Sequence, residues 1–186
     1  MNDNPEILLA ENVYDELERL ANKYRHNSTD TISYKYNIRN WITNIKNGSF
    51  NENLYYNTPP SSIMEASPCY NGNISYSSWT YNGATRAYQY DYDNLNRYVG
   101  GYCYINSEFL DSGLYSENMN YYKMGNITHL TRFDGNDCID VLTLFYNGSQ
   151  LKSVTDAYGS QKKYGLKEHN DLCDSVKEFS MTQMVI

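Results

Sequence analysis

The sequence predicts an all-β fold of repeated antiparallel hairpins, followed by an irregular C-terminal tail. Three observations lead to this prediction: a recurring Tyr-centred turn, alternation of side chains around the turns, and an unusual composition. Leu, Ile, Val and Phe make up only about a fifth of the 186 residues, whereas the chain has 21 tyrosines and 24 asparagines. Tyrosine favours strands and can bury its ring while its hydroxyl stays in water. This composition therefore suits thin sheets with two half-exposed faces.

The Tyr-centred turn occurs six times, at spacings of 22 to 34 residues. Self-similarity at such spacings indicates stacked supersecondary units. The fuller copies begin at Tyr14-Asp15, Tyr36-Asn37, Tyr92-Asp93 and Tyr121-Tyr122, and the shorter ones are Tyr70-Asn71-Gly72 and Tyr146-Asn147-Gly148. The residues expected to shape these turns are Tyr14, Asp15, Tyr36, Asn37, Tyr70, Asn71, Gly72, Tyr92, Asp93, Arg97, Tyr121, Gly125, Asn126, Tyr146, Asn147 and Gly148.

The first element, within residues 6–25, fits two descriptions. Val13, Leu17, Leu20 and Tyr24 are spaced as on one face of a helix. The Tyr14 turn, however, is the unit that recurs downstream, and this favours a hairpin.

The next elements are predicted from alternation and from turn residues. Tyr88, Tyr90 and Tyr92 alternate with small or polar residues, as in a strand with two different faces. Asn-Gly between apolar strands is a strong hairpin signal. The predicted hairpins combine 31–36 with 41–45, 86–93 with 98–104, and 141–146 with 151–154, with Asn-Gly turns at Asn47-Gly48 and Asn147-Gly148. Residues 58–62 are predicted to form a loop, because Pro59 and Pro60 break sheet pairing.

The turns beginning at Tyr14, Tyr92 and Tyr121 resemble the Tyr-Asp-x-x-Gly-Arg/Asn-Leu/Ile repeat of the bacterial RHS, or YD-repeat, proteins. The resemblance covers residues 6–165. In that family the repeats form a β-ribbon that spirals into a hollow shell around a toxic C-terminal domain, and other members are cell-surface proteins. The resemblance implies an extended, twisted YD-repeat sheet, an arc of such a spiral. It also implies a non-enzymatic shell or spacer segment of a secreted toxin or surface protein.

Three residues depart from the family pattern. Glu18 stands where the family has Gly, Tyr98 where it has Leu, and Tyr122 where it has Asp. The family's shell-closing core, with its Asp-Pro cleavage region, and its toxin domain are not found in this sequence. The resemblance therefore implies an internal fragment whose partners, the remaining repeats and the C-terminal cargo of a parent RHS protein, are missing.

The tail, residues 166–186, loses both the repeat and the alternation. Degenerate codons for Met181 to Ile186 permit Tyr-Asp-Ala-Asn-Gly-Asn, a family turn, in the neighbouring reading frame. We therefore hypothesise a frameshift here, which the coding DNA would test.

Charge and hydropathy exclude several classes of function. A net charge of −7 and a pI of about 4.9 argue against nucleic-acid binding, which needs clustered Lys and Arg. No run of 18 apolar residues is present, so no transmembrane segment is expected. The chain begins without a signal-peptide pattern, and its own localisation stays open, although family members are secreted or at the cell surface.

No catalytic constellation is recognisable, so the chain is not expected to be an enzyme or to bind a cofactor or metal. His129 lies in a predicted strand and is interpreted as a surface residue. The segment 134–140 partly matches a calcium loop, but Cys138 occupies a ligand position, so a hairpin turn is favoured. The four cysteines form no Cys-x-x-Cys motif.

Two further patterns have alternative interpretations. Asp91 and Asp93 could serve as paired carboxylates of a glycosidase, but their place in the repeat favours turn capping. Trp41 and Trp79 could stack on sugars, which makes a carbohydrate-binding or adhesive β-module, with a glycan as partner, the alternative function. Open edge strands at both ends of the array predict aggregation.

Overall fold

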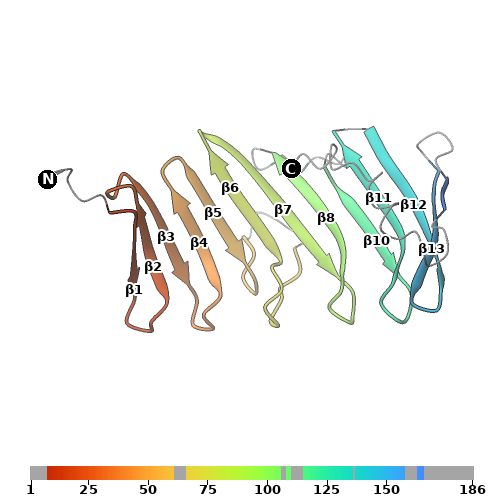
Figure 1. Cartoon of the computed structure of the whole chain (residues 1–186), viewed down its shortest axis with the longest axis horizontal. Coiled ribbons are helices and arrows are strands. Elements are labelled where there is room, and N and C mark those ends of the chain that lie inside the picture. Colours follow the sequence, from red (N-terminus) through yellow and green to blue (C-terminus); the bar gives the residue numbers. More distant parts are fainter. Residues whose placement is uncertain are drawn as a thin grey trace, which may run out of the picture. The chain divides into compact units, whose positions relative to one another are not determined.

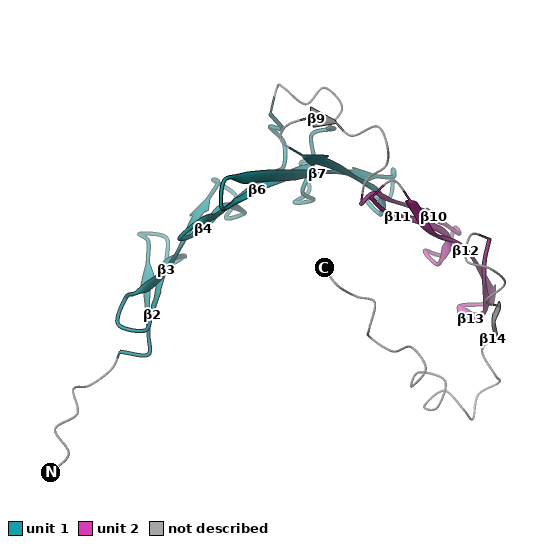
Figure 2. Ribbon diagram, turned by 90° about the horizontal axis from the view of Figure 1, so that it is seen from above, with its two compact units in different colours: residues 1–113 teal, residues 114–186 magenta. Residues whose placement is uncertain are grey.

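The computed structural model describes residues 8–60, 66–105, 108–109, 115–135, 137–157 and 163–165. These residues form β-strands and turns, as predicted from the sequence. The chain divides into two compact units, Met1–Gly113 and Leu114–Ile186 (Figure 2). The predicted tail at 166–186 and residues 61–62 of the predicted loop lie outside the described residues.

The first unit is a meander in which each strand pairs antiparallel with the next one along the chain (Figure 1). The short strand β9, Glu108–Phe109, pairs with β8. The others are β1 Ala10–Tyr14, β2 Leu20–Arg25, β3 Asp30–Tyr36, β4 Ile42–Asn47, β5 Phe50–Tyr55, β6 Tyr76–Tyr81, β7 Ala84–Tyr92 and β8 Tyr98–Ile105.

The second unit has the same local pattern of antiparallel neighbours. Its strands are β10 Glu117–Tyr121, β11 Ile127–Asp134, β12 Asp137–Asn147, β13 Gln150–Asp156 and β14 Lys163–Gly165. The hairpin of β11 and β12 replaces the calcium loop considered for residues 134–140, because Asp134 pairs directly with Asp137.

The N-terminal segment is a hairpin of β1 and β2, not a helix. Leu17, which a helix would have placed on an apolar face, is 66% exposed at the tip of the turn. Every residue of β1 is exposed. The helix-like spacing of Val13, Leu17, Leu20 and Tyr24 therefore does not form the buried face of a helix.

The Asn-Gly hairpins are confirmed, with a register shifted by one residue. Asn47 pairs with Phe50, so the tight turn consists of Gly48 and Ser49. Asn147 likewise pairs with Gln150. A true two-residue Asn-Gly turn occurs instead at Asn82-Gly83, where both φ angles are positive, as a type I′ hairpin requires.

The Tyr70 copy of the repeat is not flanked by strands, which corrects the prediction for that copy. Residues 66–75 belong to the connection between β5 and β6. The Cys69 N–H donates to Tyr56 O and the Ser75 N–H donates to Tyr55 O, both at 2.8 Å, so this connection closes against the end of β5. The predicted break at Pro59 and Pro60 is confirmed, because neither lies in a strand.

The core lies where this connection covers one face of the sheet. Tyr76, Ala87 and Tyr104 are each less than 7% exposed and pack with Ala66 from the connection. Tyr55 and Tyr104 flank Tyr76, with ring centroids 5.7 Å and 6.0 Å from it. The buried centre is therefore built from tyrosines, as the composition suggested.

The opposite face of β6, β7 and β8 carries a run of half-buried rings, here called the aromatic ladder: Trp79, Tyr88, Tyr90 and Tyr98, followed by Tyr92 at the end of β7, where a bulge between Asp91 and Tyr92 interrupts the alternation. Trp79 and Tyr88 are parallel, with centroids 5.8 Å apart, and each later ring lies 6.1–6.2 Å from the next. Such stacked or tilted pairs stabilise a sheet by about 0.5–1.5 kcal/mol each. The predicted alternation in β7 is confirmed, because Ala87 and Gln89 are buried on the other face.

Candidate functional site

The repeat turns are held by an Asx side chain at their second residue. In the turn from Tyr92 to Tyr98, Asp93 Oδ1 accepts hydrogen bonds from the N–H groups of Leu95 (2.8 Å) and Arg97 (3.0 Å). Its other oxygen accepts a bond from Arg97 Nε at 2.6 Å. The Asp93 N–H donates back to Arg97 O at 2.9 Å, which closes the turn. Turn capping is thus confirmed for Asp93.

The same bonds recur in two other turns. Asp15 accepts from the N–H groups of Leu17 (2.9 Å) and Arg19 (3.0 Å) and from Arg19 Nε (2.8 Å). Asn37 accepts from the N–H groups of Arg39 (2.9 Å) and Trp41 (3.0 Å). Because Asn37 is neutral, this turn has the cap without the ion pair.

The turn from Tyr121 to Ile127 keeps the backbone geometry without the cap. Tyr122 stands at the Asx position, and its N–H still donates to Asn126 O at 2.8 Å. The Gly125 N–H donates to Tyr122 O at 2.9 Å. This turn relies on Gly125, with φ +94°, for its left-handed residue.

The fifth residue of each of these four turns has a positive φ. The angles are 59° at Glu18, 62° at Asn40, 60° at Asn96 and 94° at Gly125. Glu18 therefore adopts the conformation for which the family uses glycine, despite its Cβ. The left-handed conformation costs a residue with a side chain about 1–2 kcal/mol.

Replacing Glu18 with Gly should stabilise the protein. Relief of the left-handed strain, less the greater entropy of glycine in the unfolded chain, leaves a net gain of about 0.5–1 kcal/mol. Urea unfolding followed by circular dichroism measures this change. Asn96→Gly is the matched control and should gain less, because asparagine tolerates this conformation. A loss of stability in Glu18→Gly would contradict the assigned turn geometry.

Acid should weaken the capped turns. The Arg97 side chain, together with the N–H groups of Arg97 and Leu95, holds the pKa of Asp93 below its ordinary 3.8. The pKa of Asp15 is lowered as well, and the largest cause is the hydrogen bond from the Arg19 N–H. The unfolded chain then takes up these protons at higher pH than the folded one, so this stability is present above about pH 3.8 and is lost as the pH falls further.

The measurement is urea unfolding from neutral pH down to about pH 2. Asp93→Asn reproduces the neutral Asn37 cap, so its free energy of unfolding should fall less with decreasing pH than that of the wild type. If Asp93→Asn loses as much stability in acid as the wild type, the Asp93 carboxylate does not contribute to the acid sensitivity.

A second recurring contact comes from the tyrosine that begins the turn. The hydroxyls of Tyr36 and Tyr92 each donate, at 2.9 Å, to the carbonyl that follows the preceding turn, Leu20 O and Ile74 O respectively. In the second unit, Tyr146 donates to Ile127 O at 2.8 Å. Each such bond joins a hairpin to the one before it.

The fourth example, Tyr56, is not among the residues expected from the sequence. Its hydroxyl donates to Ile42 O at 2.7 Å, which is the carbonyl after the Asn37 turn. The signal was present, since Tyr56-Asn57 is itself a Tyr-Asx dipeptide. The prolines that follow it obscured the repeat.

The remaining expected residues have more varied places. Tyr14 and Tyr70 are 57% and 65% exposed, and the Tyr121 hydroxyl lies 3.6 Å from Met119 Sδ. Asn71 Oδ1 accepts a bond from the Asn73 N–H at 3.0 Å. The left-handed residues of the two short turns are Gly72 (φ +100°) and Gly148 (φ +63°).

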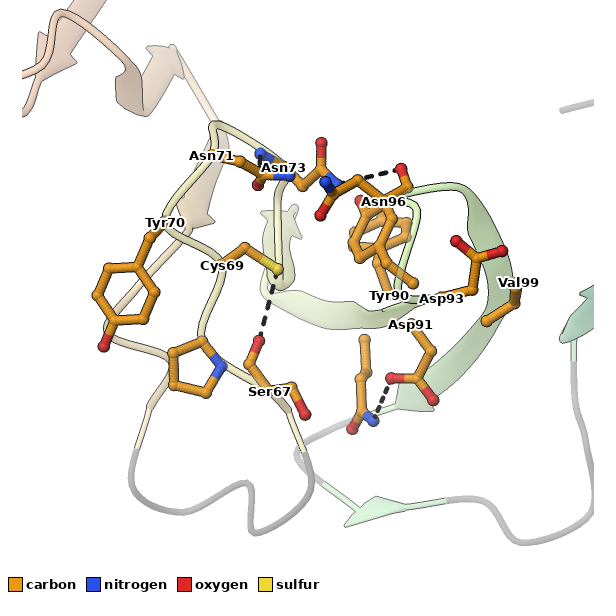
Figure 3. A pocket seen from close by; sticks show the side chains of 13 residues that line it. Ser67, Cys69, Tyr70, Asn71, Asn73, Tyr90, Asp91, Asp93, Asn96 and Val99 are labelled. Carbon is orange, nitrogen blue, oxygen red and sulfur yellow. Dashed lines mark hydrogen bonds between the residues drawn. The ribbon is translucent and has the colours of Figure 1, made fainter. Parts of the chain in front are cut away.

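A cleft of about 780 Å³ lies between the loop Ser67–Asn73 and the end of the β7–β8 hairpin (Figure 3). Asp91, on β7, faces it and accepts a bond from Gln89 Nε2 at 3.2 Å. Gln89 is held in turn by the Tyr104 hydroxyl, 2.9 Å from its Oε1. Turn capping is therefore wrong for Asp91, which projects from a strand and not from a turn.

Two of the groups that line the cleft are partly shielded from water. Burial raises the pKa of the Cys69 thiol, and the Asp91 carboxylate adds to this effect. Burial likewise raises the pKa of Tyr92 to about 12, with Cys69 as a further cause. Both groups are thus held in their neutral forms at neutral pH.

The two tryptophans that suggested sugar binding are engaged elsewhere. The ring centroids of Trp41 and Tyr56 lie 4.9 Å apart. The Cζ atom of the Arg39 guanidinium lies 5.1 Å from the centroid of the Trp41 ring. A Cβ built on Gly72 would lie 3.4 Å from the Trp41 ring, so the loop covers this indole closely. Trp79 belongs to the aromatic ladder.

The other polar residues considered from sequence are scattered. His129 is exposed on β11, as expected. Cys69, Cys103 and Cys138 are free thiols. Within the described ranges, no three His, Cys, Asp or Glu side chains are grouped as metal ligands would be. The part of the chain that the structure describes also contains no helix long and apolar enough to cross a membrane.

The capped turns recur along the described residues, and the cleft beside β7 is a concave surface among them. Comparison with known proteins finds no family model and no curated protein that matches the sequence.

Proposed function

We propose that this chain is a non-enzymatic structural repeat segment of the RHS, or YD-repeat, type. In this proposal it serves as shell or spacer material of a secreted toxin or surface protein. The observation that carries the proposal is the hydroxyl-to-carbonyl contact that joins successive hairpins at Tyr36, Tyr56, Tyr92 and Tyr146. A contact repeated at equivalent positions is what an extendable array needs.

The energetics suit this role. A single hairpin is marginally stable in water, and each one here is hydrogen-bonded edge to edge with its neighbours in the sheet. A hydrogen bond contributes about 0.5–1.5 kcal/mol, so the contacts add modestly at each junction and fix the register. Stability then accumulates along the array, as expected for repeat proteins. Such a ribbon can be lengthened without redesigning its core.

The proposal predicts that a whole repeat can be added. The test inserts a second copy of residues 15–36 directly after Tyr36, so that every turn, face and hydroxyl contact is continued. The longer protein should unfold cooperatively in urea, with a larger m-value, because m scales with the surface exposed on unfolding.

The matched control inserts residues 15–35, which omits one residue and one Tyr hydroxyl contact. A shift of one residue exchanges the two faces of the strand, so this variant should lose stability or aggregate. Equal loss of folding in both insertions would contradict the repeat proposal, because an irregular globular domain does not distinguish between the two lengths.

A further inference from the structure

The cleft beside β7 is the feature that the structural role does not require. A ribbon of hairpins needs its turns and its stacked rings, but not a concave surface. The volume of about 780 Å³ lies within the range of about 300–1,000 Å³ that small-molecule sites occupy. The loop that forms one wall is fixed, because the N–H groups of Cys69 and Ser75 donate hydrogen bonds to the Tyr56 and Tyr55 carbonyls at the end of β5.

The Asp91 carboxylate is oriented before any ligand arrives. It accepts from Gln89, and Gln89 in turn accepts from Tyr104, so a chain of two hydrogen bonds runs into the core. Gln89 is 4% and Tyr104 6% exposed, which keeps this chain in place. A carboxylate held in this way has lone pairs left for donors from a ligand.

Side-chain amides border the same space. Asn71, Asn73 and Asn96 line it, and each amide offers both donors and an acceptor. Asn71 uses its oxygen within the loop, and no described residue accepts a hydrogen bond from its nitrogen. Figure 3 shows Asn73 and Asn96 side by side at one rim of the cleft and Asp91 across from them.

Charge restricts the ligand. No Lys or Arg is among the described residues that line the cleft, so an anion has no cationic partner there. The carboxylate of Asp93 is already neutralised by Arg97, 2.5 Å away. What remains is one carboxylate, several amides and the wall formed by Tyr92, a combination that suits a neutral ligand rich in hydroxyl groups.

We propose that this cleft binds a neutral carbohydrate, with Asp91 and the amides of Asn71, Asn73 and Asn96 hydrogen-bonded to sugar hydroxyls. Tyr92 also lines the cleft, and the hydrogen bond from its hydroxyl to Ile74 O holds its ring in place. The ring can then offer an apolar surface to the sugar. The tryptophans have no part in this site. A sugar site on a structural ribbon would give it an adhesive surface.

The test titrates the full chain with glucose, galactose, N-acetylglucosamine and their short β-linked oligomers, and with spermidine as a cationic comparison. Binding is followed by calorimetry and by NMR of labelled protein. The expected result is saturable binding of at least one of these sugars. Asp91→Asn should weaken it at least about tenfold, because it replaces a charged acceptor while keeping the side-chain shape.

Asn96→Gly and Asn40→Gly form the matched pair. Both residues are the fifth of a repeat turn, with φ of 60° and 62°, so the backbone accepts glycine at both positions, but only Asn96 lines the cleft. Asn40→Gly also removes a hydrogen bond from Arg19 to Asn40 Oδ1, which lies outside the cleft. Binding should weaken in Asn96→Gly and persist in Asn40→Gly. Failure of every sugar to bind, equal affinity in Asp91→Asn, or binding of spermidine in place of sugars would each overturn the proposal.

Discussion

Tyr76→Ala should unfold the first unit or leave it barely stable, with a loss of about 3–5 kcal/mol. Tyr76 is 5% exposed and contacts Tyr55 and Tyr104, and the connection after β5 packs on it through Ala66. Few apolar residues are buried around Tyr76, so other side chains cannot fill the cavity that the substitution leaves. A loss of this size is a large part of the stability of a small domain.

Urea unfolding followed by near-ultraviolet circular dichroism measures the effect, since the tyrosine signal reports on packing. Tyr81→Ala is the matched control on the same strand. Tyr81 is 57% exposed, so its removal should change the free energy of unfolding by no more than about 0.5 kcal/mol. Similar losses in the two variants would mean that the centre assigned around Tyr76 is not the core.

The second large effect is expected at Gly101, on the face of the aromatic ladder. A Cβ built on Gly101 would lie 2.3 Å from the Tyr98 hydroxyl oxygen but 3.4 Å from the ring carbon that carries it. Gly101→Ala should therefore displace Tyr98 from its contacts with Tyr90 and Tyr92, at a cost of about 1–3 kcal/mol.

A second substitution tests this explanation. Tyr98→Phe removes the colliding oxygen, so the double variant Gly101→Ala/Tyr98→Phe should be more stable than the sum of the two single changes predicts. The four proteins form a double-mutant cycle, and an interaction energy of about 1 kcal/mol or more is expected. Additive losses would indicate that the methyl group is accommodated in some other way.

The turns could be predicted from sequence because everything that shapes them is local. An Asx residue reaches the N–H groups two and four positions ahead whatever lies around it, so Asp15, Asn37 and Asp93 could be recognised from their own neighbours. The resemblance to the YD-repeat motif rests on the same local residues. Glu18 shows that the turn tolerates a residue which the motif alone would reject.

The cleft could not be predicted, because it depends on contacts between distant residues. Its loop is positioned by the hydrogen bond from the Cys69 N–H to Tyr56 O and by the packing of Gly72 on Trp41. Gly72 and Trp41 are about thirty residues apart in the chain. No local pattern indicates that these segments meet. The same contacts explain why Trp41, an attractive sugar platform in the sequence, is covered, and why Asp91, adjacent to a capped turn, faces a cleft.

The hydroxyl contacts all lie at one end of the hairpins, the end drawn lowest in Figure 1 for the first unit. At the other end, a Cβ added to Gly48 or Gly83 would have no neighbouring atom within 4 Å. We therefore expect that changes there leave the hydroxyl contacts between repeats intact. These outer turns are therefore places where foreign peptides can be displayed, and a row of them would present several copies at regular intervals along one border of the sheet.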